Sequence, residues 1–113
     1  MKPILFALGL AIFPAGAALA DAVPAPVVTI VLKDHRYTPD VITVPAGQKI
    51  RIDITNRDAT TDDFESADMH VDRDLKPHEH AVFSIGPLKP GHYAFTGELY
   101  AATAHGEVIA VAP

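Results

Sequence analysis

Apolar and polar residues alternate along short segments of this chain, and this alternation limits the folds that it can adopt. In the segment KIRIDIT, residues 49–55, isoleucine occupies every second position between charged or polar residues. Successive side chains of a β-strand point to opposite faces of a sheet, so this pattern predicts a strand with one buried face. No apolar stripe at helical spacing persists long enough to predict a helix. The chain is therefore expected to form an all-β domain.

Further segments have the composition and spacing of strands. Turn signals, PAG after residue 44 and LKPG at 88–91, separate several of them. The segment FESADMHV, residues 64–71, also fits an extended conformation. About seven short strands with turns between them are typical of a β-sandwich. The other predicted strands are residues 27–32, 41–44, 80–85, 92–96 and 107–111.

The first twenty residues have the pattern of a secretory signal peptide. Lys2 precedes an apolar run, and Ala18-Leu19-Ala20 matches a cleavage site with small residues. The apolar run is shorter than the roughly 20 residues that span a bilayer, although an uncleaved anchor is the alternative. We therefore expect an exported protein that is not embedded in the membrane. It would be cleaved near residue 20, with a flexible lead-in at 21–26 and one domain at 27–113.

Composition excludes several classes of function. Fourteen Asp and Glu residues against nine Lys and Arg give a formal net charge of −5, which argues against nucleic acid and anionic membranes as partners. The chain has no cysteine, so disulfides, thiolate metal sites and thiol catalysis are excluded. Common enzyme motifs such as GxSxG and HExxH are absent. The surface suits cations or a basic protein patch.

Candidate metal ligands are concentrated in the predicted loops. Because loops cluster at the two ends of a sandwich, the turns that follow the first strand and precede the last are expected to meet. Carboxylate and imidazole ligands suit Fe, Mn, Cu(II) and Zn, and they disfavour Cu(I). His35, Glu98 and His105 each have an alternative role in an ordinary polar turn or loop, whereas Glu65 lies in a segment that fits an extended conformation, where a buried carboxylate needs a partner. The predicted ligands are His35, Glu65, Glu98 and His105, and Asp63 and Tyr100 are expected to complete or tune the site.

A second candidate site lies in the segment MHVDRDLKPHEH, residues 69–80. Met69 and His70 are adjacent, and His78 and His80 are two residues apart. Residues two apart on a strand share a face, so these imidazoles would bind one ion if the segment were extended. A polar turn at KPHEH, residues 76–80, before a strand is the alternative.

Several motifs in order resemble the cupredoxin family across residues 27–113. These motifs are YTP before the second predicted strand, VPAG before the third, the lead-in LKPGHYAF and the closing HGEV. A narrower resemblance, in KDHRYTP, DDFES and GELYAATAHG, is to the cysteine-free cupredoxin-like proteins of periplasmic ferrous-iron uptake (Ftr-type) and to the EfeO cupredoxin domain. The resemblance implies a Greek-key β-sandwich in the periplasm.

The same resemblance implies copper or iron as the cofactor and His35, Glu65 and Glu98 as ligands. Tyr100 stands where relatives have a histidine, and His105 stands where a blue-copper protein has its axial methionine. The implied partners are a P19-type periplasmic iron-binding protein, a membrane iron permease and a ferredoxin-like membrane protein. Without a cysteine thiolate, a type 1 (blue) copper site is excluded.

Three hypotheses follow from the sequence. The first is a metal-binding cupredoxin that acts in ferrous-iron uptake. Whether it also assists the oxidation of Fe(II) is left open. The second is a periplasmic copper carrier that uses Met69, His70, His78 and His80. The third is a metal-free adhesion or assembly sandwich that shares the fold. The native metal, the number of sites, the redox partner and the choice between monomer and homodimer stay open at this point.

Overall fold

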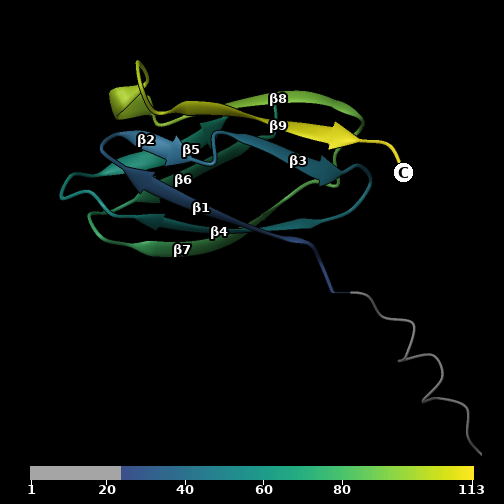
Figure 1. Cartoon of the computed structure of the whole chain (residues 1–113), viewed down its shortest axis with the longest axis horizontal. Helices are drawn as coiled ribbons and strands as arrows, with labels where there is room; N and C mark the ends of the chain where they lie inside the picture. The colour runs from purple at the N-terminus through teal and green to yellow at the C-terminus, as the bar shows by residue number, and fades with distance from the viewer. Residues whose placement is uncertain (1–23) are drawn as a thin grey trace, which may run out of the picture.

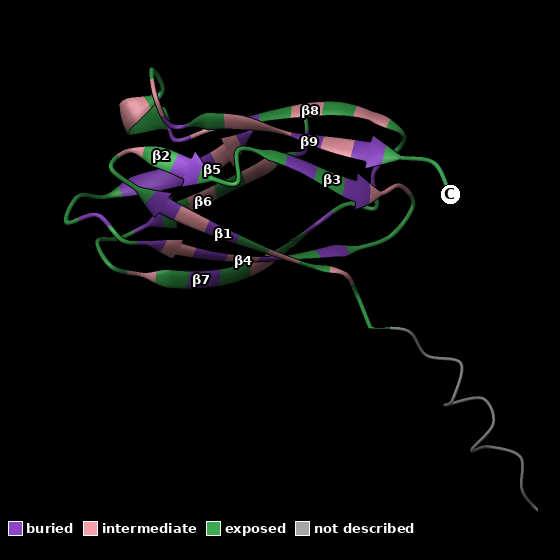
Figure 2. Ribbon diagram, viewed as in Figure 1, coloured by how far each residue is buried: buried purple, intermediate pink, exposed green. Residues whose placement is uncertain are grey.

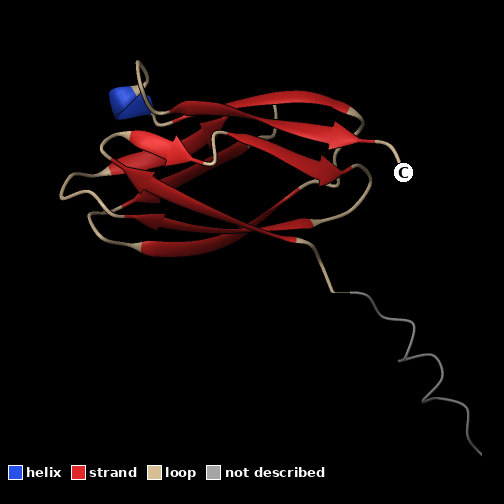
Figure 3. Ribbon diagram, viewed as in Figure 1, coloured by secondary structure: helices blue, strands red, loops and turns tan. Residues whose placement is uncertain are grey.

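The computed structural model describes residues 24–113, which form a sandwich of two β-sheets (Figures 1 and 3). The predicted signal peptide, residues 1–20, lies outside the described residues, as do positions 21–23 of the predicted lead-in. In the described part of the chain no helix is long and apolar enough to cross a membrane. The elements are β1 (Val27–Lys33), β2 (Arg36–Thr38), β3 (Val41–Pro45), β4 (Ile50–Asn56), β5 (Asp62–Ser66), β6 (Val71–Leu75), β7 (His80–Ile85), β8 (Gly91–Thr96), the 3₁₀ turn η1 (Glu98–Tyr100) and β9 (His105–Val111).

The two sheets differ in size and in strand order. One sheet has the order β2-β1-β4-β7, and the other has the order β3-β9-β8-β5-β6. The pairs β1–β4 and β3–β9 are parallel, and the other neighbouring strands are antiparallel. This arrangement confirms the predicted all-β sandwich.

The core fills the space between the sheets, and β4 shows how the sequence specifies it. Ile50, Ile52 and Ile54 are fully buried, whereas Arg51 between them is exposed (Figure 2). Burying one such side chain contributes roughly 1.5–3 kcal/mol, so the alternation fixes which face of the strand packs inward. The alternation predicted for residues 49–55 is confirmed.

Aromatic rings fill the core beneath the loops that follow β1, β4 and β8. The rings of Phe64 in β5 and Phe95 in β8 stack with their centroids 4.6 Å apart. Tyr37 in β2 packs edge-on against Phe95 at 5.1 Å, and its hydroxyl donates a hydrogen bond to the carbonyl of Asp63. Strand β2 is therefore joined to the opposite sheet by packing and by a buried hydrogen bond.

Loops far apart in the sequence meet at one end of the sandwich, which we call the loop end (Figure 1). The loop end consists of the β1–β2 turn at 34–35, the β4–β5 loop at 57–61, the β6–β7 turn at 76–79 and the β8–β9 segment at 97–104. Because β1 and β4 run parallel, both strands deliver their following loops to this end. The prediction that the turns beside the first and last strands meet is confirmed.

Residues 24–113 form nine strands where the sequence predicted about seven. Strand β2 has only three residues, and its pairing with β1 rather than its composition makes it a strand. Strand β6 lies within the segment 69–80, and only its first residue belongs to the segment 64–71 that fits an extended conformation. Strand β5 begins at Asp62, before the segment 64–71 that fits an extended conformation, because Asp62 and Asp63 pair with Leu75 and Asp74 of β6. These residues are therefore in strands because they pair with a neighbouring strand, and not because of their own composition.

Candidate metal centre

The β1–β2 turn, which carries His35, is fixed by a carboxylate from the β4–β5 loop. The N–H groups of Asp34 and His35 donate hydrogen bonds of 2.7 and 2.9 Å to the two carboxylate oxygens of Asp58. Both donors have a positive φ, 52° and 57°, which Asp and His adopt more readily than most residues. Asp58 donates its own N–H to the side-chain oxygen of buried Asn56 at 2.9 Å. The turn is thereby tied to the end of β4.

The protonation of Asp58 reflects these contacts. Burial by itself would raise the pKa of Asp58, but the N–H groups of His35 and Asp34 outweigh burial and hold that pKa below its usual value. The Nδ1 atom of His35 lies 3.6 Å from an oxygen of Asp58, too far for a hydrogen bond but close enough for electrostatic attraction. The imidazole therefore lies beside an ionised carboxylate.

The ring of His35 also contacts the segment before β9. The rings of His35 and Tyr100 are stacked, with centroids 3.7 Å apart and planes inclined by 14°. Tyr100 is the last residue of η1, and its side chain also packs against the hydrophobic core. The stack therefore joins two loops that the sequence separates by more than sixty positions.

Two consecutive aspartates at the start of β5 hold the η1 turn. Asp62 and Asp63 point to opposite faces of the strand, as neighbours on a strand must. One oxygen of Asp63 accepts the N–H of Glu98 at 2.7 Å, and one oxygen of Asp62 accepts the N–H of Leu99 at 3.2 Å. The second oxygen of Asp62 is buried and has no hydrogen-bond partner among residues 24–113. Gly97 packs against that oxygen, where a Cβ atom would lie only 2.5 Å away.

Three carboxylates converge beside this turn. One oxygen each from Asp63, Glu65 and Glu98 lie within 4.8 Å of one another, and we call these residues the carboxylate trio. Asp63 and Glu65 are two apart on β5 and share a face, while η1 supplies Glu98. Burial, which is the largest cause, raises the pKa of Asp63, and the charge of nearby carboxylates such as Asp62 raises it further. The hydrogen bond from the N–H of Glu98 lowers this pKa but does not cancel the increase. The trio concentrates negative charge that a cation would neutralise.

A second group of carboxylates adjoins the first on the same sheet. Asp63, Asp72 and Asp74 also bring their oxygens within 4.8 Å of one another. The antiparallel register of β5 and β6 places Asp74 opposite Asp63 and Asp72 opposite Glu65. Asp63 belongs to both groups, so this face of the sheet is continuously acidic.

The structure separates the four predicted ligands. Glu65 and Glu98 come together with Asp63, as the predicted loop-end site requires. His35 and His105 belong to neither carboxylate group. His35 instead contacts Tyr100 and Asp58, and exposed His105 lines a separate depression of about 280 Å³ that Tyr37 also lines. The aromatic ring of Tyr100 has a defined contact in the stack with His35.

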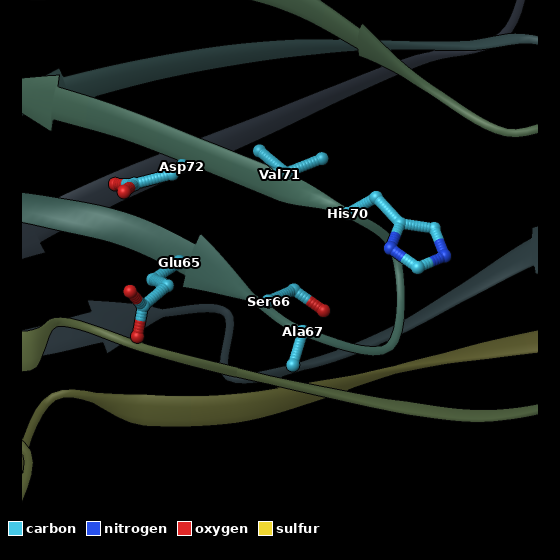
Figure 4. Close-up of a pocket in the computed structure, with 6 residues that line it drawn as sticks. All are labelled: Glu65, Ser66, Ala67, His70, Val71 and Asp72. Atoms are coloured by element: carbon cyan, nitrogen blue, oxygen red, sulfur yellow. The ribbon is translucent and has the colours of Figure 1, made fainter.

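The segment proposed for a copper carrier is organised differently from its prediction. Met69 is only 8% exposed and belongs to the hydrophobic core. His80 pairs with Asp53 on the neighbouring strand β4, and His78 lies in the β6–β7 turn. His70 lies on the turn between β5 and β6 and lines an open depression of about 420 Å³ with Glu65 (Figure 4). The sulfur of Met69 is therefore not exposed beside these imidazoles, because its side chain packs in the hydrophobic core.

Sequence reasoning did not identify the structural roles of three residues that shape this region. Asp58 fixes the His35 turn, buried Asn56 supports Asp58, and Asp62 holds η1. Asp72 and Asp74 were also missed. The alternation of VDRDL at 71–75 was the signal for β6, and its recognition would have placed both carboxylates on one face.

Comparison with known proteins identifies the fold. A family model described as "Cupredoxin-like domain" matches residues 4–110. An uncharacterized protein of Rickettsia prowazekii is 42% identical over 82 residues, which are 73% of this chain. The match spans 66% of that relative's length, slightly less than two thirds.

Solved structures resemble this chain in fold at low sequence identity. The metal-binding domain of the Cu(I)-exporting P-type ATPase CopA of Streptococcus pneumoniae, solved with Cu(I), has a TM-score of 0.67 at 15% identity and covers 75% of this chain and 84% of its own. Auracyanin of Roseiflexus castenholzii has a TM-score of 0.64 at 18% identity and covers 77% and 98%. The purple cupredoxin of Nitrosopumilus maritimus has a TM-score of 0.56 at 15% identity and covers 74% and 98%.

Proposed function

The chain belongs to the cupredoxin-like domain family, and from this premise we propose that it binds a metal ion through the carboxylate trio and acts in ferrous-iron uptake. The observation that carries the proposal is the approach of three carboxylate oxygens, from Asp63, Glu65 and Glu98, to within 4.8 Å of one another. Such an approach costs electrostatic energy in the absence of a cation. A bound cation would offset that cost.

The chemistry of these donors selects among metals. Carboxylate oxygens are hard ligands, which suit iron and Cu(II) better than Cu(I). The chain has no cysteine and its Met69 is buried, so a type 1 copper site is excluded and the soft ligands that Cu(I) prefers are not offered at the surface of residues 24–113. The site fits Cu(II) or iron, and a bound ion would supply positive charge and Lewis acidity there.

The role in iron uptake rests on the resemblance of KDHRYTP, DDFES and GELYAATAHG to the cysteine-free cupredoxin-like proteins. We propose a periplasmic location and partnership with a P19-type periplasmic iron-binding protein and a membrane iron permease. Anionic oxygen ligands favour Fe(III) over Fe(II), so such a site would ease the oxidation of incoming Fe(II). Following the loss of Fe(II) in air, with and without copper, tests that part of the proposal.

The binding proposal is tested by calorimetric titration of metal-stripped protein with Cu(II), and with Fe(II) under anaerobic conditions. Asp63→Asn, Glu65→Gln and Glu98→Gln each keep the shape of the side chain and remove its charge. We expect one equivalent to bind to the parent, and each variant to weaken that binding about tenfold or more. Glu107→Gln is the matched control, because Glu107 lies on β9 beside His92 and outside both carboxylate groups. Equal affinity in all these proteins would contradict the proposal.

A further inference from the structure

Tyr100 lies two residues after Glu98 in the same 3₁₀ turn. The main chain of this turn is tied to β5 by the two hydrogen bonds that Asp63 and Asp62 accept. The far end of the turn has a third attachment, the stack of Tyr100 on His35 at 3.7 Å and 14°. Glu98 itself is exposed, so its carboxylate depends on the turn for its position.

The backbone at His35, on which Tyr100 stacks, is held in place by hydrogen bonds. The carboxylate of Asp58 accepts the backbone N–H groups of both Asp34 and His35, and Asn56 anchors Asp58. The Nδ2 group of Asn56 donates to three backbone carbonyls, including that of Leu75 at 3.0 Å. These bonds hold the backbone that carries the His35 ring, so a loop residue that stacks on the ring is attached to a fixed part of the fold.

We propose that Tyr100 is a positioning residue, whose stack on His35 holds the η1 turn so that the Glu98 carboxylate stays beside Asp63 and Glu65. This inference rests on the proposed binding of metal by the carboxylate trio. It assigns the aromatic ring of Tyr100, and not its hydroxyl, to the site. It also gives His35 the role of a support for the loop.

Two substitutions at Tyr100 separate these roles. Tyr100→Phe removes the hydroxyl and keeps a ring that stacks, while Tyr100→Leu keeps an apolar side chain and removes the stack. In calorimetric titration of the metal-stripped full chain with Cu(II), we expect Tyr100→Phe to bind within twofold of the parent. Tyr100→Leu should bind about tenfold more weakly, as is typical when support for a ligand is lost. Equal weakening in both variants would identify the hydroxyl as a ligand and overturn the proposal, as would parent affinity in both.

A double-mutant cycle shows whether Tyr100 acts through Glu98. In a Glu98→Gln background, Tyr100→Leu should have no further effect on the affinity for Cu(II), because the carboxylate that it positions is already gone. A full tenfold loss in that background would mean a general disturbance of the fold and would overturn the proposal. Thermal unfolding of each variant confirms that the sandwich is intact.

Amide hydrogen exchange tests the positioning in the absence of metal. In metal-free protein, Tyr100→Leu should speed exchange at the amides of Glu98 and Leu99 about tenfold, and Tyr100→Phe should leave it unchanged. Unchanged exchange in Tyr100→Leu would overturn the proposal. If the parent bound no ion, the proposed function would fail while the exchange rates still decided whether Tyr100 positions the turn.

Discussion

Asp62 and Asp63 show how two identical neighbours on one strand take different roles. Strand geometry turns Asp63 toward the other carboxylates of the trio and turns Asp62 into the interior against Gly97. Asp62 is 2% exposed and keeps one oxygen without a hydrogen-bond partner in the described part of the chain. Its position therefore depends on the space that the missing side chain of Gly97 leaves open.

We predict that Gly97→Ala destabilises the protein. The new Cβ would lie 2.5 Å from the Asp62 carboxylate, and such overpacking typically costs about 1–3 kcal/mol. Urea unfolding at neutral pH measures the loss. The variant Asp62→Ala serves as the control, because it removes the group that the new methyl meets. If Gly97→Ala cost as much in the Asp62→Ala background as in the parent, the clash would not be the cause.

At the scale of single residues, the sequence predicted some roles and could not predict others. Glu65 and Glu98 stood out because charged residues beside apolar strands suggest a site. The structural roles of Asp58 and Asp62 were not predictable, because each accepts hydrogen bonds from backbone groups 23 to 37 positions away. Only the folded chain shows which N–H groups lie opposite a carboxylate.

Strand β2 connects the two sheets, although it has only three residues. Its central residue, Tyr37, packs in the aromatic core and donates a hydrogen bond to the carbonyl of Asp63 on β5. Burial, together with the charges of Asp62 and Asp63, raises the pKa of the Tyr37 hydroxyl far above its usual value, so the hydroxyl remains a donor at any ordinary pH. The contact thus anchors the strand that carries Asp63.

Tyr37→Phe should destabilise the protein by about 1–2 kcal/mol, because a buried donor to a carbonyl is lost. Tyr93→Phe is the matched control, since its hydroxyl donates to the carbonyl of Lys89 at 2.7 Å in an exposed position. We expect that control to cost less than half as much, as water can replace the lost donor. Chemical denaturation compares the unfolding free energies of the two variants. Equal losses would show that the buried hydrogen bond between the sheets stabilises the protein no more than the exposed one.

The attachment of the β1–β2 turn to the β4–β5 loop should depend on pH. The pKa of Asp58 is lower in the folded protein than its unfolded value of about 3.9, so its contribution to stability is present above about pH 4 and is lost as pH falls through the folded pKa. Asp58→Asn keeps one acceptor oxygen and should cost about 1–2 kcal/mol at pH 7.

The difference in unfolding free energy between parent and Asp58→Asn should shrink as pH falls below about 4. Denaturant unfolding between pH 2.5 and 7 measures this dependence. A difference that stayed constant over that range would show that the charge of Asp58 does not hold the turn.

At the scale of elements, strands with a clear apolar face were predictable, including the edge strands β3 and β7, whereas the edge strands β2 and β6 were not. Residues 49–55 contain their own signal in alternating isoleucines, and β4 lies in the middle of its sheet. Strands β2 and β6 are edge strands, with one neighbour each and polar residues on their outer face. The tendency of a segment to form a strand depends on what it packs against, so such edges cannot be deduced from composition.

The whole molecule combines a cupredoxin-like sandwich with the carboxylate trio that we propose as a metal site. Ion binding should therefore stabilise the entire fold. At a Cu(II) concentration 100 times the dissociation constant, mass action predicts a gain of about 2.7 kcal/mol in unfolding free energy. Thermal unfolding with and without Cu(II) measures the gain, and Glu98→Gln should reduce it. An equal gain in Glu98→Gln would place the ion elsewhere.

Anomalous diffraction from crystals grown with one equivalent of Cu(II) locates the ion directly and is the decisive measurement. The account predicts a single strong peak within bonding distance of the carboxylate oxygens of Asp63, Glu65 and Glu98. A principal peak at His70 or His78, or the absence of any ordered peak, would contradict a metal centre in the carboxylate trio.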